Sequence, residues 1–144
     1  MSKADYDTDF YGWTQAQAEA LRAKDWAALD MDHLAEEIED VGNSVRFAIE
    51  SQLVRLLLHL LKLRHDPATR PRRRWKATVD AAREEIAKRA TGGLQHHPER
   101  YLPDAYRQAR RRAMLAMDRP LGGIPEICPL TIAQVLNADF FPER

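Results

Sequence analysis

The sequence predicts an all-α fold, a single-domain helical bundle of about five or six helices over residues 1–144. Two observations favour helices: apolar residues recur at three- and four-residue steps along most of the chain, and no alternating pattern typical of strands stands out. A third observation favours a buried core, because 44% of the 144 residues are apolar, which is enough for the core of one domain.

The first helix is expected from about residue 10 to residue 24, with Asp9 as its N-terminal cap. Trp13 lies on the apolar face of this segment, so we expect it to have a structural role. Residues 25–29 then form a short connection to the next helix.

A long central helix is expected around residues 32–65, with Asp30 or Asp32 as its cap. Beyond residue 52 its apolar residues lie on every side, which is typical of a helix at the centre of a bundle. Gly42 lies inside this helix, where glycine costs about 1 kcal/mol relative to alanine, so it marks the expected position of a kink or a break. One face carries an apolar stripe over about eight turns: Leu34, Ile38, Val41, Val45, Ala48 or Ile49, Gln52, Leu56, His59 and Leu63.

Three further helices are expected in the second half of the chain. Pro71 suits the first turn of one helix, which is expected to stop at Gly92-Gly93. Pro98 or Pro103 opens the next helix, and Thr131 caps a short last helix.

The charges are unevenly distributed, although 22 basic and 22 acidic residues cancel over the whole chain. Residues 1–50 hold 4 basic and 12 acidic residues, residues 51–119 hold 17 basic and 7 acidic, and residues 120–144 hold 1 basic and 3 acidic. The acidic and basic segments can attract each other within one chain or between copies.

The sequence favours a cytoplasmic protein with no membrane partner. Cys128 is the one cysteine, so no intrachain disulfide can form, and residues 1–13 contain no apolar signal segment. The longest apolar run, residues 56–61, is far shorter than the roughly 20 residues of a membrane-spanning helix.

Five motifs occur in order over nearly the whole chain: DFYGW at 9–13, LAEEIEDVG at 34–42, LLLHLLK at 56–62, RRWKATVDAAREEI at 73–86 and PEICPLTIAQVL at 125–136. In these motifs the chain resembles the bacterial family called domain of unknown function 29. The resemblance implies a small all-helical bacterial protein, and it implies no activity. The chain departs from the family pattern at Leu63, where the family often has tryptophan, and at Arg74, where it often has serine.

The motif LAEEIEDVG places several carboxylates in one turn and a half of helix. At 100° per residue, Glu37 is the glutamate that lies beside the apolar stripe, so it is expected to be half-buried. An unpaired buried charge is costly, so Glu37 needs a partner such as Arg83 or Arg55. The simplest interpretation is a solvated helix start with one ion pair, and the alternative is a metal or acid–base site.

His59 is expected in the middle of the buried stripe, as a core residue that donates one ring N–H to a carbonyl or carboxylate. The alternative is a ligand, an acid–base group or a pH switch. An enzyme would use Glu37 as base or ligand, His59 as acid or ligand and Arg83 as an anion clamp. No HExxH motif, repeated Glu-x-x-His or glycine-rich phosphate loop occurs, so no metal and no cofactor is expected.

The basic segment RPRRRWK at 70–76 is a candidate for nucleic-acid binding, and arginines at 107–112 can extend it. Trp75 could stack on a base. However, apolar residues follow Trp75 at three- and four-residue steps, so we expect it in the core, with the arginines facing solvent or the acidic N-terminal segment. The candidate phosphate contacts are Arg72, Arg73, Arg74 and Lys76.

Together these observations favour a non-enzymatic macromolecular interaction or regulatory module. It is expected to bind a protein partner, or a copy of itself, through its charged surfaces and a helix face. Nucleic-acid binding and the enzyme hypothesis stay open as alternatives.

Overall fold

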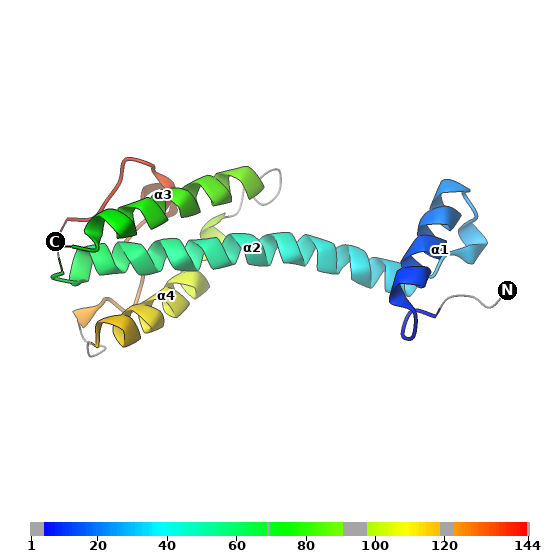
Figure 1. Cartoon of the computed structure of the whole chain (residues 1–144), viewed down its shortest axis with the longest axis horizontal. Helices are drawn as coiled ribbons and strands as arrows, with labels where there is room; N and C mark the ends of the chain where they lie inside the picture. Colours follow the sequence, from blue (N-terminus) through cyan, green and yellow to red (C-terminus); the bar gives the residue numbers. More distant parts are fainter. Residues whose placement is uncertain (1–4, 69, 91–97, 119–122, 144) are drawn as a thin grey trace. The chain divides into compact units, whose positions relative to one another are not determined.

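The computed structural model describes residues 5–68, 70–90, 98–118 and 123–143, and these ranges contain helices and no strand (Figure 1). The all-α fold predicted from the sequence is confirmed, including its long central helix. The elements in chain order are α1 (Phe10–Arg22), η1 (Trp26–Ala28), α2 (Met31–His65), α3 (Arg72–Arg89), η3 (Pro98–Arg100), α4 (Leu102–Met117) and α5 (Ile132–Leu136), where η denotes a 3-10 helix.

Two helices begin at the caps that the sequence predicts. The Asp9 carboxylate accepts a hydrogen bond from the backbone N–H of Gly12 at 3.0 Å. At the start of α5, Thr131 Oγ1 accepts from the Gln134 N–H at 3.2 Å, and Gln134 Oε1 accepts from the Thr131 N–H at 3.0 Å. Such caps satisfy N–H groups that have no partner inside the helix, so the local sequence decides where these helices begin.

The starts of α3 and α4 also follow the prolines. α3 begins directly after Pro71 and ends at Arg89. Its predicted stop at Gly92-Gly93 lies outside the described residues. α4 begins with Pro103 in its first turn and η3 precedes it, so the second of the two predicted starts is the observed one.

α2 is one uninterrupted helix of 35 residues, so the break considered at Gly42 does not occur. A Cβ atom built on Gly42 would meet no other atom within 4 Å. Packing therefore does not require a glycine at this position.

The chain divides into two compact units, unit 1 (Met1–Ser44) and unit 2 (Val45–Arg144). Unit 1 contains 3 basic and 11 acidic residues, a net charge of −8, and unit 2 contains 19 basic and 11 acidic residues, a net charge of +8. The single domain expected over residues 1–144 stays a prediction.

The interior of unit 1 lies between α1 and the residues that lead into α2. Trp13 is 3% exposed, and its indole N–H donates to the Asp30 carboxylate at 3.1 Å. Gln17 is also buried, and its Oε1 accepts from the Asp30 backbone N–H at 2.7 Å. These two hydrogen bonds connect α1 to the start of α2.

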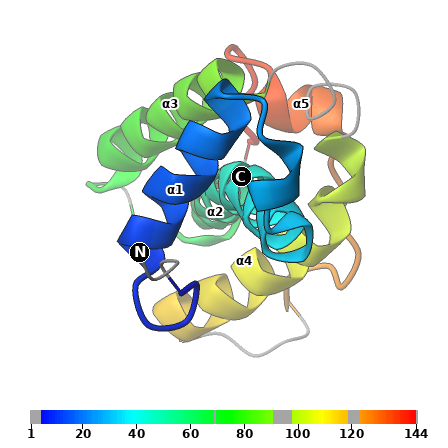
Figure 2. The same ribbon diagram turned by 90° about the vertical axis from the view of Figure 1, so that its right-hand side faces the viewer.

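In unit 2, α2 lies at the centre with α3, α4 and α5 around it (Figure 2). This arrangement explains why the second half of α2 is apolar on several sides. α4 contributes Ala105, Ala109 and Ala113 at four-residue steps, which places them on one helix face. The buried residues of α2 and α3 are Ile49, Leu53, Val54, Leu56, Leu57, Leu60, Leu61, Leu63, Trp75, Val79, Ala82, Arg83 and Ile86.

The predicted apolar stripe of α2 is buried only in part. Leu56 and Leu63 are fully buried, whereas Ile38 and Val41 are 70% and 66% exposed. His59 lies between these two leucines in the stripe, but it is only half-buried, so it is less buried than the sequence predicts. The helical period gives the positions of a stripe, but it does not decide which neighbours cover it.

Candidate functional site

Asp30, the residue before α2, is the centre of a polar network in unit 1. Its Oδ2 atom accepts from the Trp13 indole and lies 2.7 Å from His33 Nδ1. The hydrogen bond with His33 lowers the pKa of the Asp30 carboxyl, and the same bond raises the pKa of the His33 imidazole. The imidazole and the carboxylate therefore stabilise each other's charged form.

Glu37 joins this network and is half-buried, as predicted, although the stripe residues Ile38 and Val41 next to it are exposed. The Tyr6 hydroxyl donates a hydrogen bond to Glu37 Oε1, and the Tyr6 ring stacks on His33 with the ring centroids 3.8 Å apart. The hydrogen bond to Glu37 is the main cause that raises the pKa of Tyr6 to about 12. The partner of Glu37 is thus a tyrosine, whereas the sequence pattern favours Arg83 or Arg55.

Sequence reasoning missed Tyr6 because it lies 31 positions from Glu37, and no local period relates the two. The spacing of Asp30 and His33 is the signal that could have indicated the network, since side chains three positions apart meet at a helix start. The contacts of the network join the N-terminal residues to the first turns of α2. The network therefore has a structural role.

An apolar groove of about 540 Å³ is formed in unit 1 by the end of α1, η1 and the first turns of α2. Trp26, Met31 and Ile38 are 63%, 66% and 70% exposed there. Contiguous exposed apolar surface of this kind marks interaction sites in soluble proteins. The residues that line the apolar groove are Leu21, Trp26, Leu29, Met31, Leu34, Ala35 and Ile38.

Arg83 lies in the interior of unit 2 and is 6% exposed. Its Nε donates to the Val135 carbonyl and its Nη2 to the Phe140 carbonyl, both at 2.8 Å. Its guanidinium carbon also lies 5.2 Å from the ring centroid of Phe141. Arg83 therefore joins α3 to the C-terminal segment through main-chain carbonyls.

His59 is bonded to the main chain of its own helix. Its Nδ1 lies 2.7 Å from the Arg55 carbonyl oxygen, one turn earlier on α2. A carbonyl oxygen only accepts, so Nδ1 carries the hydrogen. Burial lowers the pKa of His59, and the charges of Lys62 and Arg55 lower it further. This is the bonding expected of a structural histidine.

The three residues of the enzyme hypothesis are distributed over both units. Glu37 lies in unit 1, whereas His59 and Arg83 lie in unit 2, and each is bonded within its own unit. In the described part of the chain, no group of three or more His, Cys, Asp or Glu side chains is placed to hold a metal ion. The catalytic role of these residues stays a prediction.

Two members of the basic segment make contacts inside unit 2. Arg72 is half-buried, and its Nη1 donates to the Leu63 carbonyl near the end of α2 at 2.8 Å. Lys76 Nζ lies over the ring of Phe141, 5.4 Å from its centroid. These two side chains therefore have contacts within the fold.

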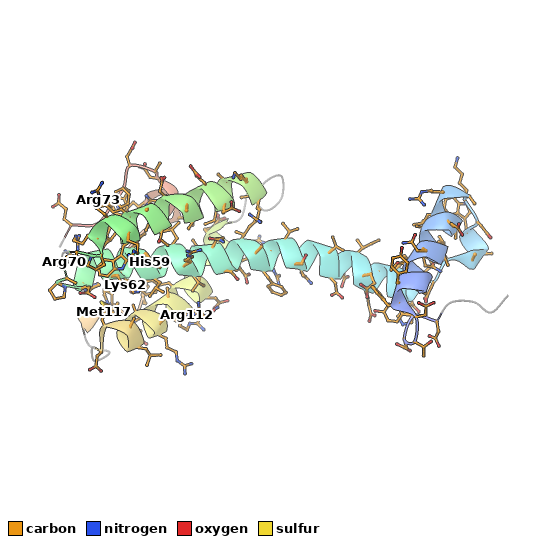
Figure 3. All side chains as sticks on the ribbon, in the orientation of Figure 1. His59, Lys62, Arg70, Arg73, Arg112 and Met117 are labelled. Atoms are coloured by element: carbon orange, nitrogen blue, oxygen red, sulfur yellow. The ribbon has the colours of Figure 1, made fainter. Side chains whose placement is uncertain are left out.

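The other members of the basic segment differ in exposure. Trp75 is 9% exposed in the core of unit 2, so its ring is not open to a base. Arg73 and Arg74 are exposed at the start of α3, and Arg55 is exposed on α2. Lys62 of α2 lies beside this segment, with Nζ 5.9 Å from the Trp75 ring centroid. Figure 3 labels the positions of His59, Lys62, Arg70, Arg73, Arg112 and Met117 in unit 2.

The arginines of α4 are partly used in the fold as well. Arg110 Nε donates to the Ile124 carbonyl at 3.1 Å, and Arg107 pairs with Asp104 at 3.0 Å. Arg112 is exposed. The arginines at 107–112 therefore do not form one uniform cationic patch.

The chain belongs to the family described as Domain of unknown function DUF29, whose model matches residues 6–141. The resemblance seen in the sequence motifs is confirmed. Neither a curated protein nor a solved structure matches the chain. Among the helices that the structure describes, none is long and apolar enough to cross a membrane.

Proposed function

We propose that this protein is a non-enzymatic interaction module, and that the apolar groove of unit 1 binds an amphipathic helix with basic residues beside its apolar face. The observation that carries the proposal is the exposure of Trp26, Met31 and Ile38 around one continuous apolar groove. Fully burying one such side chain contributes about 1.5–3 kcal/mol, so three of them supply a substantial driving force for binding.

Acidic residues beside the groove favour a basic partner. At 100° per residue, Met31 and Ile38 lie about 20° apart on α2. Asp32 follows Met31 and Glu39 follows Ile38, so each carboxylate lies about 100° further around the helix than its apolar neighbour. Both carboxylates are exposed, and unit 1 as a whole has a net charge of −8. Lysines or arginines beside the apolar face of a partner would be attracted to this rim and oriented by it.

The spacing of the groove residues favours a helix as the partner. Met31, Leu34 and Ile38 are three and four positions apart on α2, so their side chains form a ridge along one face. The apolar side chains of a second helix can pack beside this ridge. Amphipathic helices are usually bound in this way.

The test places a photo-crosslinking amino acid at Trp26, inside the groove, in cells of the source organism. The matched control carries it at Tyr11, which is 75% exposed on α1 and does not line the groove. We expect an adduct from position 26 alone, and a cross-linked segment that is apolar on one helix face with lysine or arginine beside it. A synthetic peptide of that segment should bind about tenfold or more weakly to Asp32→Lys/Glu39→Lys, which corresponds to at least 1.4 kcal/mol.

Four results would contradict this function: no adduct at position 26, equal adducts at both positions, an acidic cross-linked segment, or a second copy of this chain in the groove. Circular dichroism of each variant shows whether the helices are intact.

The enzyme hypothesis has less support, because His59 and Arg83 donate hydrogen bonds to main-chain carbonyls within the fold.

A further inference from the structure

We propose that unit 2 binds a small carboxylic acid with an apolar body in a cavity beside the end of α2, with the carboxylate of the acid on Arg64. The cavity has a volume of about 320 Å³ and is lined by α2, α4, the segment after α4 and Pro142. Small-molecule sites have volumes of about 300–1,000 Å³ and mostly apolar walls with a few polar groups. The cavity belongs to unit 2, and it is separate from the apolar groove of unit 1 and from the function proposed for it.

One face of α2 forms the floor of the cavity and carries Arg64 at its end. Leu57, Leu60, Leu61 and Arg64 all line the cavity, and they follow each other at three- and four-residue steps. The three leucines are at most 5% exposed, whereas Arg64 is exposed. At 100° per residue, Arg64 lies about 20° from Leu57 around the helix and about 10 Å further along it. The floor is therefore apolar over most of its length and cationic at one end.

The other walls of the cavity are also apolar. Pro125, Pro129 and Pro142 line it, and proline has no backbone N–H to offer to a polar ligand. Tyr106 lines the cavity too, but its hydroxyl donates a hydrogen bond to the Pro125 carbonyl. Burial is the main cause that raises the pKa of Tyr106 to about 12, so the phenol stays neutral and does not repel an anion. These walls suit a hydrocarbon body.

Arg64 is held in place and keeps hydrogen-bond donors for a ligand. Its Nη1 donates to the Glu143 carbonyl at 2.6 Å, which uses one of the five N–H groups of the guanidinium. In the described part of the chain, Arg64 forms no ion pair with an acidic side chain. A guanidinium binds a carboxylate through two parallel hydrogen bonds, and Nε and Nη2 are placed side by side for this geometry.

The charges around the cavity favour an anion. Arg64 and His65 line it, and they belong to the basic last turn of α2, which offsets the negative end of the helix dipole. Among the described residues that line the cavity, none is acidic. A larger cavity of about 560 Å³ beside α4 differs in this respect, because Glu126 lines it and its Arg107 pairs with Asp104. The cationic end of the smaller cavity is therefore the better site for a carboxylate.

The volume of the cavity favours an acid of medium length. An apolar cavity of roughly 150 Å³ holds one benzene molecule, so about 320 Å³ holds a body of about twice that size. An alkanoate such as octanoate fits this description. Each CH₂ group that is buried should tighten binding by about fourfold until the cavity is filled.

The test is isothermal titration calorimetry of the full chain with hexanoate, octanoate, octanol and octylamine. The last three share one hydrocarbon chain and differ in the charge of the head group. Octanoate should bind about fifteenfold more tightly than hexanoate, because it buries two more CH₂ groups. Octanol should bind more weakly than octanoate, and octylammonium should bind most weakly.

Leucine methyl NMR locates the bound acid. Octanoate should shift the methyl signals of Leu57, Leu60 and Leu61, which line the cavity. The signals of Leu21 and Leu34, which line the apolar groove of unit 1, should stay unchanged. Leu130→Trp should fill the cavity and abolish binding of all the probes, because Leu130 is a half-buried residue of its wall.

Arg64→Met separates recognition of the carboxylate from the shape of the cavity. It should weaken octanoate about 10- to 100-fold and leave octanol unchanged, since only octanoate loses hydrogen bonds with a charged donor. Arg55→Met is the matched control, because Arg55 is exposed on the same helix about 180° away from Arg64. It should leave the binding of both probes unchanged. Circular dichroism of each variant shows whether the helices are intact.

Four results would overturn the proposal: no binding of octanoate at millimolar concentration, octanol binding as tightly as octanoate, equal weakening of both probes by Arg64→Met, or shifts confined to the groove leucines of unit 1. Trp26→Ala in the apolar groove should leave octanoate binding unchanged. The failure of this proposal is thus distinguishable from the failure of the function proposed for unit 1.

Discussion

Replacing Arg83 by methionine should lower the free energy of unfolding by about 3–6 kcal/mol. Methionine keeps a long side chain in the interior of unit 2, but it removes the donors to the Val135 and Phe140 carbonyls, both at 2.8 Å. A hydrogen bond with a charged donor contributes about 1.5–3 kcal/mol, so two of them give this range. The contacts to the Gln134 and Ala138 carbonyls, at 3.5 Å, are at the limit of hydrogen-bond geometry and add little.

Urea unfolding followed by circular dichroism measures the loss. Hydrogen exchange should accelerate most in residues 131–143, because Arg83 joins α3 to that segment. Arg83→Lys keeps the charge, but a single ammonium group does not reproduce the planar fork of the guanidinium. We therefore expect the lysine variant to lie between the wild type and the methionine variant.

Arg89→Met is the matched control on the same helix, where the exposed Arg89 pairs with Glu85. A surface pair contributes about 0–1 kcal/mol, so this variant should lose no more than that. If Arg83→Met loses as little as Arg89→Met, the assignment of Arg83 as the residue that holds the C-terminal segment is refuted.

Three further predictions concern single sites. Gly42→Ala should raise the free energy of unfolding by about 1 kcal/mol, because alanine favours the helix and its Cβ meets nothing within 4 Å; a decrease in urea midpoint would contradict this. Burial raises the pKa of Cys128, so its alkylation at pH 8 should be slower in the folded protein than in the urea-unfolded chain, and equal rates would count against the half-buried thiol. The pKa of His33 is raised in the folded protein, so its contribution to stability is complete below pH 6.5 and is lost as the pH rises through the folded-state pKa. The pKa of Asp30 is lowered in the folded protein, so its contribution is complete above pH 3.8 and is lost as the pH falls through the folded-state pKa. Unit 1 should thus resist urea best between these pH values, and His33→Gln should flatten the alkaline side of the profile; tryptophan fluorescence reports the transition.

The helices and the interior of unit 2 could be predicted from the sequence because their signals are local. Asp9 and Thr131 cap helices through hydrogen bonds to residues three positions away, so the caps are visible in a short stretch of sequence. The long central helix follows from the apolar period, and its placement at the centre of unit 2 follows from apolar residues on several of its sides.

The partners of the charged residues were decided by the tertiary structure alone. Glu37 bonds to Tyr6 across 31 positions, and Arg83 bonds to Val135 across 52 positions, distances over which no sequence period carries information. The same holds for the stripe on α2, of which Leu56 is covered and Ile38 is exposed. Periodicity determines the direction in which a side chain projects from its helix, whereas burial and pairing depend on which distant segment packs against that side.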